Sequence, residues 1–312
     1  MTGARPRLRG VIPAILTAFN KEGEIDLEGQ RAFVSWLVQN GIHGIFACGT
    51  GGDYLAMSVS DRMKVMEATV EANAGRVPVL AQTGHYATKT TIELSRHAMS
   101  LGVDALAIIT PYYLPRGDEE FYRHYALVRE AVDLPIIMYH NPAFAGPNLA
   151  PDLIARMYQD NLIVGLKDSS GEVGRNVNMR LMCGPDFIMI HGLDVFPVES
   201  FLMGANAWVA GVANVLPREF GNVYNLAAEG NWSAVRDEWF RLKPFVNFCT
   251  TPKEGRASYQ MQIYHSGVRM RGVPVGYTPF PGIPLEERGE YGAGLLSQLR
   301  SLLEQLGHPI AA

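Results

Sequence analysis

Cysteine is scarce in this sequence, and its arrangement excludes two kinds of site. The 312 residues contain three cysteines, Cys48, Cys183 and Cys249, which lie far apart and are odd in number. They therefore predict neither a disulfide framework nor the paired CxxC ligands of a zinc site. A chain without structural disulfides is typical of a reducing compartment, and we expect a cytoplasmic protein.

Basic clusters and long apolar runs are lacking as well. Lysine and arginine number 27 against 31 aspartates and glutamates, which gives a formal net charge of -4. Because no basic cluster occurs along the chain, we expect no nucleic-acid partner. The apolar stretch VIPAIL ends at Thr17, so it is too short for a signal peptide or a membrane span. We therefore expect a soluble protein with no membrane partner.

What the sequence does contain is a regular alternation of short apolar runs and helical patterns. A helical segment follows each of eight such runs: GVIPAILTAF, GIFACGTGGD, VPVLAQTGH, DALAIITPYY, LPIIMYHNP, LIVGLKDSS, DFIMIHGLD and AWVAGVANV. Eight βα units in about 230 residues predict an α/β protein with a (β/α)8 TIM barrel. A doubly wound open sheet is the alternative, but it normally has a glycine fingerprint after its first strand, and ILTAFNKEG is not one.

The last part of the chain departs from this alternation. WSAVRDEWFRLKPFVNF and EYGAGLLSQLRSLLEQLG predict helices, whereas RGVPVGYTPFPGIPLEERG between them is rich in proline and glycine. The latter composition predicts irregular structure. We therefore divide the chain into a barrel over residues 1–230, which carries the active site, and a C-terminal helical extension over residues 231–312.

Chemically active residues gather where the predicted strands end, and in a (β/α)8 barrel these ends meet at one mouth. Lys167 directly follows the apolar residues 163–166, with no turn residue between them. Burial in an apolar barrel lowers the pKa of a lysine, and the neutral amine condenses with ketones to form an imine. The alternative is a structural lysine that reaches water or pairs with Asp168 or Glu172.

Two neighbouring features complete a site for a 2-oxo acid. Tyr139 ends the preceding predicted strand, where its phenol can carry protons between a substrate hydroxyl and the imine. The turn GTGGD offers successive backbone N–H groups, from Gly49 through Gly52, that are suited to binding a carboxylate. An amine for the ketone and a nest for the carboxylate together predict a 2-oxo acid as the substrate.

These motifs, in this order, resemble the dihydrodipicolinate synthase / N-acetylneuraminate lyase family. GTGGD, TPYY, YHNPAFAG and GLKDSSGE carry the resemblance, which extends over essentially the whole chain. It implies a class I aldolase barrel, Schiff-base chemistry with pyruvate, and a homotetramer. It also implies roles for single residues: Lys167 forms the imine and Tyr139 shuttles protons. Thr50 and Gly51 hold the carboxylate through their backbone, and the Thr50 hydroxyl forms a hydrogen bond with Tyr139. Tyr113 reaches across a subunit interface, and Val209 lines the pyruvate pocket.

Two departures from the family pattern bear on the substrate. Gly51 stands where the common GTTGE loop has a second hydroxyl residue, which leaves a relay from Tyr139 through Thr50 to Tyr113 incomplete. Phe144 stands at the position of an arginine that grips the carboxylate of the aldehyde in the synthases. From Phe144 we expect a protein other than a true dihydrodipicolinate synthase.

The rest of the predicted mouth offers few partners for a long polyol. Gly192 and Asp194 lie in HGLD after the seventh predicted strand, but Asp194 is followed by Val195 where sialic acid lyases have a glutamate. His85 and His140 are further candidates, which would donate to a substrate hydroxyl or a second carboxylate from the mouth. A short 2-oxo acid is therefore the expected substrate.

Three classes of function remain open. The first is an aldolase that forms or cleaves a 4-hydroxy-2-oxo acid or a 2-keto-3-deoxy sugar acid, using or releasing pyruvate. The second is a dehydratase or deaminase on the same imine, acting on a 2-keto-3-deoxy sugar acid or a hydroxy-pyrroline-carboxylate. The third is a non-catalytic barrel that binds a 2-oxo acid, which the presence of both Lys167 and Tyr139 disfavours. No set of His, Asp and Glu has the spacing of metal ligands, and we expect no metal or organic cofactor.

Overall fold

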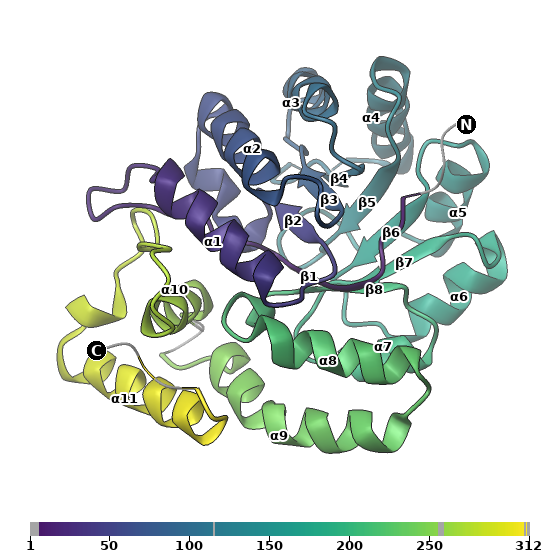
Figure 1. The fold of residues 1–312 in the computed structure, drawn as a ribbon. Coiled ribbons are helices and arrows are strands. Elements are labelled where there is room, and N and C mark those ends of the chain that lie inside the picture. The colour runs from purple at the N-terminus through teal and green to yellow at the C-terminus, as the bar shows by residue number, and fades with distance from the viewer. Residues whose placement is uncertain (1–5, 115, 255–258, 309, 311–312) are drawn as a thin grey trace.

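Eight short parallel strands form the centre of the molecule, as the computed structural model shows (Figure 1). The structure describes residues 6–114, 116–254, 259–308 and 310. The strands are β1 (Gly10–Pro13), β2 (Ile45–Ala47), β3 (Val79–Gln82), β4 (Ala105–Ile109), β5 (Ile136–His140), β6 (Gly165–Asp168), β7 (Ile188–His191) and β8 (Ala207–Ala210). They pair in the order β1-β8-β7-β6-β5-β4-β3-β2, and a parallel bridge between Ala14 and Phe46 closes the ring. The predicted (β/α)8 barrel is therefore confirmed.

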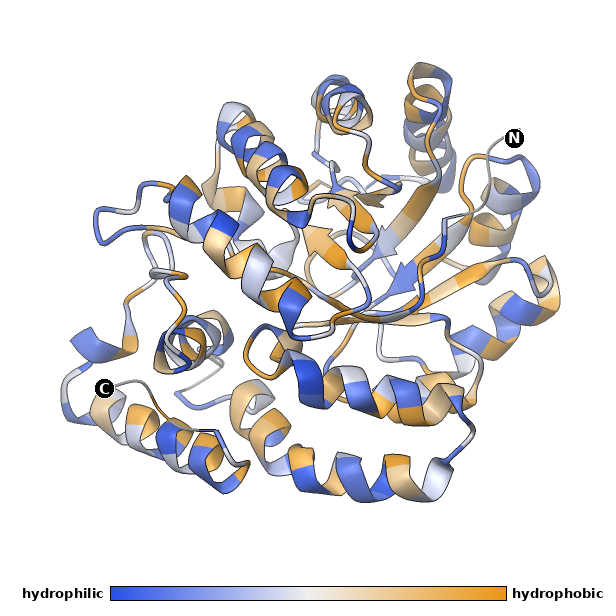
Figure 2. Ribbon diagram, in the orientation of Figure 1, coloured by the Kyte–Doolittle hydropathy of each residue, from blue (hydrophilic) through white to orange (hydrophobic). Residues whose placement is uncertain are grey.

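Helices follow the strands and cover the outside of the barrel. They are α1 (Leu27–Gln39), α2 (Val59–Asn73), α3 (Thr88–Ser100), α4 (Asp118–Ala131), α5 (Pro151–Gln159), α6 (Gly174–Cys183), α7 (Pro197–Leu202) and α8 (Pro217–Ala228). Some begin at a side chain that caps them: Asp26 accepts a hydrogen bond from the Gly29 backbone, and Ser58 accepts one from the Asp61 backbone. Figure 2 shows apolar residues concentrated in the strands, and apolar and polar residues mixed along the outer helices, which is the pattern of helices packed on a buried sheet.

The register between β5 and β6 decides which side chains meet inside the barrel. Tyr139 pairs with Lys167, and His140 pairs with Asp168. Because successive residues of a strand point to opposite faces, the first pair projects into the barrel and the second pair projects toward the surrounding helices. The centre of the barrel therefore receives a phenol and an amine at the same level.

Three further helices follow the barrel and pack against it. They are α9 (Trp232–Thr250), α10 (Gln260–Met270) and α11 (Gly289–Gln305), and Figure 1 shows them on one side of the molecule. Trp239 of α9 packs edge-on against Trp208 of β8 with 6.2 Å between ring centroids, and both rings belong to one continuous hydrophobic core. The proposed division near residue 230 falls between α8 and α9. Over the described ranges of the chain, none of the helices is long and apolar enough to cross a membrane.

Candidate active site

Lys167 lies near the carboxyl end of β6 and projects into the barrel, where it is 2% exposed. Its Nζ donates to Ser169 Oγ at 3.1 Å and lies 3.6 Å from the centroid of the Tyr139 ring. Burial lowers the pKa of Lys167 from its ordinary value of 10.5, although Tyr139 and two buried carboxyl groups, those of Asp168 and Asp194, oppose this shift. An enclosed lysine with a lowered pKa is suited to act as a nucleophile.

The phenol of Tyr139 is held by two polar side chains. Its hydroxyl lies 3.1 Å from Thr50 Oγ1 and accepts a hydrogen bond from Asn141 Nδ2 at 3.0 Å. Burial by itself would raise the pKa of Tyr139, but the charge of Lys167 and the hydrogen bonds from Thr50 and Asn141 outweigh it, so the pKa lies below 10.0. A phenol with a lowered pKa beside an amine with a lowered pKa is suited to exchange protons with a bound substrate.

The glycine-rich turn after β2 folds into a short 3-10 helix, η1 (Thr50–Gly52). The backbone N–H of Gly52 donates to the Gly49 carbonyl at 3.0 Å, and that of Asp53 donates to the Thr50 carbonyl at 3.1 Å. The N–H groups of Thr50 and Gly51 have no acceptor among the residues that the structure describes. Two adjacent free N–H groups beside Lys167 are suited to holding the carboxylate of a 2-oxo acid.

Two glycines keep the space around these groups open. A Cβ on Gly51 would lie 2.5 Å from the Ala14 carbonyl oxygen, and a Cβ on Gly192 would lie 2.2 Å from Ser169 Oγ and 3.0 Å from Lys167 Nζ. The missing second hydroxyl residue of the loop therefore has a structural cause, because the Ala14 carbonyl, directly after β1, occupies the place of its side chain. Gly192 leaves the amine room to react.

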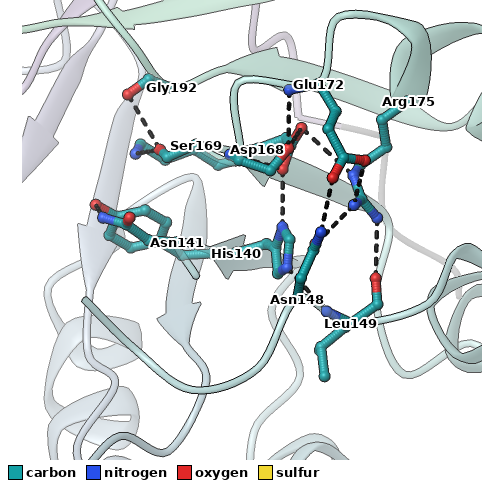
Figure 3. A network of polar contacts seen from close by, with 12 residues as sticks. His140, Asn141, Asn148, Leu149, Asp168, Ser169, Glu172, Arg175 and Gly192 are labelled. Carbon is teal, nitrogen blue, oxygen red and sulfur yellow. Dashed lines mark hydrogen bonds and ion pairs between the residues drawn. The ribbon is translucent and has the colours of Figure 1, made fainter. Parts of the chain in front are cut away.

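On the other face of the same strands, His140 and Asp168 begin a buried polar network (Figure 3). His140 Nδ1 lies 2.8 Å from Asp168 Oδ1, and His140 Nε2 accepts a hydrogen bond from the Leu149 backbone N–H at 3.1 Å. Because Nε2 is an acceptor, we assign the ring proton to Nδ1, which donates to Asp168. Burial would raise the pKa of Asp168, but His140, together with a serine and an arginine nearby, holds it below its ordinary value.

Arg175 of α6 extends this network to the loop between β5 and α5 (Figure 3). Its guanidinium donates to the Leu149 carbonyl at 2.9 Å, to Asn148 Oδ1 at 2.7 Å and to Glu172 Oε2 at 2.8 Å. Its Nε also lies 3.6 Å from Asp168 Oδ2. The network thus joins the loops that follow β5 and β6, which are the strands that carry Tyr139 and Lys167.

Lys167, Tyr139 and the turn after β2 line a cavity of about 130 Å³ at the carboxyl ends of the strands. The predicted site residues that line it are Thr50, Gly51, Tyr139, Phe144, Lys167, Gly192, Asp194 and Val209. Gly49 and Gly52 do not line it and instead form the hydrogen bond within the turn.

Tyr113, His85 and His140 do not line this cavity. Tyr113 is 92% exposed, with a backbone φ of 80°. The imidazole of His85 accepts a hydrogen bond from the Ala87 backbone at the start of α3. His140 faces the helices rather than the mouth, and both of its ring nitrogens are engaged in the network described above. His140 is therefore not placed to donate to a substrate, whereas His85 has only its Nδ1 engaged and does not line the cavity.

Several lining residues were not predicted from the sequence. They are Ala14, Phe46, Asn141, Ser169, Leu193, Gly211, Gln260, Met261 and Tyr264. Ser169 lies two residues after Lys167, and this spacing places it on the same side of the strand, so strand alternation was a usable signal. Gln260, Met261 and Tyr264 come from α10 in the C-terminal region, and no local pattern connects them with the barrel mouth. Among the described residues, no group of three or more His, Cys, Asp and Glu is arranged to hold a metal ion.

The family model, the curated relatives and the solved structures that match this chain all point to one family. The model of the dihydrodipicolinate synthetase family matches residues 7–289. A 4-hydroxy-tetrahydrodipicolinate synthase of Methanothrix thermoacetophila is 33% identical over 96% of this chain and 97% of its own length. Another, from Syntrophobacter fumaroxidans, is 33% identical over 81% of this chain and 88% of its own. The crystal structure of dihydrodipicolinate synthase from Aquifex aeolicus superposes with a TM-score of 0.88 at 26% identity, over 98% of this chain and 100% of the other.

These relatives contradict one expectation from the sequence. Phe144 led us to expect a protein other than a dihydrodipicolinate synthase, and that expectation was wrong, because relatives at 33% identity over most of the chain are such synthases. Phe144 is 75% exposed at the edge of the cavity. The substitution at Phe144 alone therefore does not set this chain apart from the synthases.

Proposed function

This chain belongs to the dihydrodipicolinate synthetase family, and on that premise we propose that Lys167 forms a Schiff base with pyruvate, which the chain joins to, or releases from, a short aldehyde. The family consists of pyruvate-dependent class I lyases of the aldolase type. The observation that supports this role for Lys167 is its enclosure beside Tyr139 with a lowered pKa.

The proposed reaction begins when the neutral Lys167 amine attacks the ketone carbon of pyruvate. Loss of water and uptake of a proton from solvent give a protonated imine, which draws electrons from the adjacent methyl carbon so that this carbon gives a proton to water. The resulting enamine attacks the aldehyde, and the new alkoxide takes a proton from the Tyr139 phenol. Water then hydrolyses the protonated imine and restores the neutral amine, and the proton that this step releases returns to the Tyr139 phenolate. Because the protonated imine serves as the electron sink, the reaction requires no metal or organic cofactor, and turnover in the presence of a chelator would test this.

Recognition of the carboxylate of pyruvate is assigned to the turn after β2. The free backbone N–H groups of Thr50 and Gly51 would donate to it, and Val209 of β8, which lines the cavity, would contact the methyl group. A cavity of about 130 Å³ favours a short partner, so the proposed substrates are a short 4-hydroxy-2-oxo acid or a 2-keto-3-deoxy sugar acid.

A second candidate reaction is the one named for the relatives, 4-hydroxy-tetrahydrodipicolinate synthesis, in which pyruvate is condensed with aspartate semialdehyde. The 33% identity over nearly the whole chain favours it. Both candidates use the same imine, so the acceptor aldehyde distinguishes them. Elimination of water or ammonia from the imine would instead give a product that keeps all its carbon atoms.

We also propose that the chain assembles as a homo-oligomer, a tetramer in the form that the family resemblance implies. Tyr113 supports this proposal because a large aromatic side chain that is 92% exposed at a φ of 80° suits a contact with a second copy. Light scattering on the purified protein would measure the mass of the assembly, and a monomer at micromolar concentration would contradict the proposal.

The central test traps the imine. Pyruvate with sodium borohydride should leave one reduced adduct, which peptide mapping should place on Lys167. Lys167→Arg should abolish both the adduct and turnover, because a guanidinium does not form an imine. Lys253→Arg is the matched control, since burial also lowers the pKa of Lys253 outside the cavity. An adduct on another lysine, or none, would overturn the proposal.

Product analysis then assigns the substrate. Pyruvate is offered with aspartate semialdehyde and with glyceraldehyde, and a 2-keto-3-deoxy sugar acid is offered alone. The product mass separates condensation, cleavage and elimination. The highest kcat/KM in this panel identifies the acceptor.

A further inference from the structure

One wall of the active-site cavity is built by a helix from outside the barrel. Gln260, Met261 and Tyr264 of α10 line the same cavity as Lys167. Figure 1 shows α10 among the C-terminal helices, at the side of the barrel. The C-terminal region therefore supplies part of the reaction chamber as well as an outer cover.

The α10 side chains hold a buried carboxyl group through hydrogen bonds. Tyr264 Oη donates to Asp194 Oδ2 at 2.8 Å. Gln260 Nε2 donates to Tyr264 Oη at 2.6 Å and lies 3.3 Å from Asp194 Oδ2. The Gly211 backbone N–H donates to the other oxygen, Asp194 Oδ1, at 2.9 Å. Donors from α10 and from Gly211 after β8 thus fix the orientation of Asp194.

Gly211, directly after β8, makes this arrangement possible. A Cβ at residue 211 would lie 2.7 Å from Asp194 Oδ2 and 2.9 Å from Tyr264 Oη, closer than real side-chain contacts. Any larger residue there would push Tyr264 away from Asp194. The space that a side chain at residue 211 would occupy is therefore taken up by the phenol of Tyr264 from the C-terminal region.

Lys167 and Asp194 are the two charged side chains among the described residues that line the cavity. Each shifts the pKa of the other, and burial raises the pKa of Asp194 to about 6. At neutral pH the carboxylate is a hydrogen-bond acceptor within the chamber in which Lys167 would hold the pyruvate imine. A partner molecule with a donor group would gain a hydrogen bond there, whereas one without it would leave a buried charge less well solvated.

We propose that Tyr264 and Gln260 are positioning residues, which aim Asp194 at a hydroxyl or ammonium group on the carbon next to the aldehyde carbonyl of the acceptor. The proposal rests on the proposed function, since it assumes that pyruvate occupies Lys167. It assigns specificity for the acceptor, rather than for pyruvate, to the C-terminal region.

The experiment compares glyceraldehyde with 3-hydroxypropanal, which lacks only the hydroxyl on the carbon next to the carbonyl. The wild-type protein should prefer glyceraldehyde in kcat/KM. Tyr264→Phe should reduce that preference about tenfold, because a site built around a hydrogen bond loses discrimination when its geometry is released. Borohydride trapping of pyruvate on Lys167 should proceed at the wild-type rate. Gln260→Met should act in the same direction with a smaller effect.

A pH profile separates positioning from general damage. The Tyr264 hydrogen bond lowers the pKa of Asp194, so Tyr264→Phe should move the acidic limb of kcat/KM for glyceraldehyde to higher pH and leave that for 3-hydroxypropanal in place. Tyr125→Phe is the matched control, since Tyr125 is a buried tyrosine of α4 whose phenol donates to the Ile108 carbonyl at 2.6 Å. It should keep both the preference and the profile.

Two results would overturn the proposal while leaving the proposed function intact. They are the absence of a preference for glyceraldehyde in the wild-type protein, and an unchanged preference in both Tyr264→Phe and Gln260→Met, with pyruvate still trapped on Lys167. Failure of the trap itself would instead reject the proposed function.

Discussion

At the scale of single residues, the contacts of Tyr139 divide the reaction into two parts. The amine of Lys167 needs only to be neutral and close to the ketone to form the imine, whereas the phenol moves protons during the carbon chemistry. We expect Tyr139→Phe to keep borohydride trapping and to lower turnover by about 10²–10⁴-fold, the range typical of a lost general acid or base. Thr50→Val should cost less, because Asn141 also donates to the Tyr139 hydroxyl.

Steady-state rates and trapping on both variants, with the best substrate of the panel, check this expectation. Near wild-type turnover by Tyr139→Phe would show that another group carries the proton. A failure to form the imine would place the role of Tyr139 before the carbon chemistry begins.

A second prediction concerns Gly51, where the common family loop has a hydroxyl residue. Gly51→Thr would place a Cβ 2.5 Å from the Ala14 carbonyl oxygen, and because this neighbour is backbone, the turn itself must move. We expect weaker pyruvate binding, measured as a KM for pyruvate raised about tenfold or more, since misplaced positioning groups commonly cost this much. Gly75→Thr is a poor comparison because of its positive φ, whereas Gly174→Thr, with open space around it, is a suitable control.

If Gly51→Thr instead raised turnover and left the KM for pyruvate unchanged, the loop would have room for a second hydroxyl. The structural cause assigned to the glycine would then be incorrect.

At the scale of elements, the parts of the site that follow strand alternation could be predicted from the sequence. Lys167 and Tyr139 lie one residue before the ends of neighbouring strands, and the paired register of β5 and β6 sets them side by side. The prediction for His140 used only its nearness in sequence to Tyr139. One step along a strand reverses the face, which is why His140 projects toward Asp168 and the helices.

The contribution of α10 could not be predicted in this way. Tyr264 reaches Asp194 through tertiary packing, and its own helix shows only the apolar periodicity of an ordinary packed helix. The need for a glycine at residue 211 is evident only from the structure, in which a Cβ there would lie too close to Tyr264 Oη. Local sequence patterns therefore predict which strand ends carry the reactive residues. Which residues complete the wall of the cavity depends on the packing of helices that are distant in sequence.

A prediction at this scale concerns Arg175, which ties the loops after β5 and β6 together. Its side chain is 3% exposed, and it faces Glu172 and Asp168. We expect Arg175→Met to lower the free energy of unfolding by about 3 kcal/mol, because removal of one partner leaves buried acceptors unpaired. Arg180→Met on the same helix should cost less than about 1 kcal/mol, since exposed hydrogen bonds contribute little.

Urea unfolding of both variants measures the difference. Turnover should also fall in Arg175→Met, while pyruvate is still trapped on Lys167, because the loop after β5 contains Asn141, which holds the Tyr139 hydroxyl. Equal stability of the two arginine variants would mean that the network does not hold the loops.

At the scale of the whole molecule, buried ionisable groups link stability to pH. Burial lowers the pKa of His124 and His191 to about 4 and that of His265 to about 3, from 6.5. Burial raises the pKa of Asp53 and Asp194 to about 6, from 3.8. The histidines and the aspartates change the free energy of unfolding in opposite directions when the pH falls, so the sum of their contributions decides whether the protein gains or loses stability.

The sign of each contribution follows from which state binds more protons. Each histidine binds its proton in the unfolded state first, so the stability it contributes is present above pH 6.5 and is lost as the pH falls toward 4. Each aspartate binds its proton in the folded state first, so it adds stability as the pH falls through 6. Because three histidines act against two aspartates, the free energy of unfolding falls as the pH falls. Between pH 6.5 and 6 the aspartates offset little of the stability that the histidines lose.

We therefore expect the free energy of unfolding to fall by about 2 kcal/mol between pH 7.5 and pH 5.5, as measured by urea titration at both values. In His265→Phe this difference should shrink by about 1 kcal/mol, because one of the three histidine contributions is removed. Comparing the two pH values within each variant cancels the cost of the substitution itself. Greater stability at pH 5.5 than at pH 7.5 would mean that the buried carboxyl groups outweigh the histidines. An undiminished difference in His265→Phe would mean that His265 does not titrate as its burial implies.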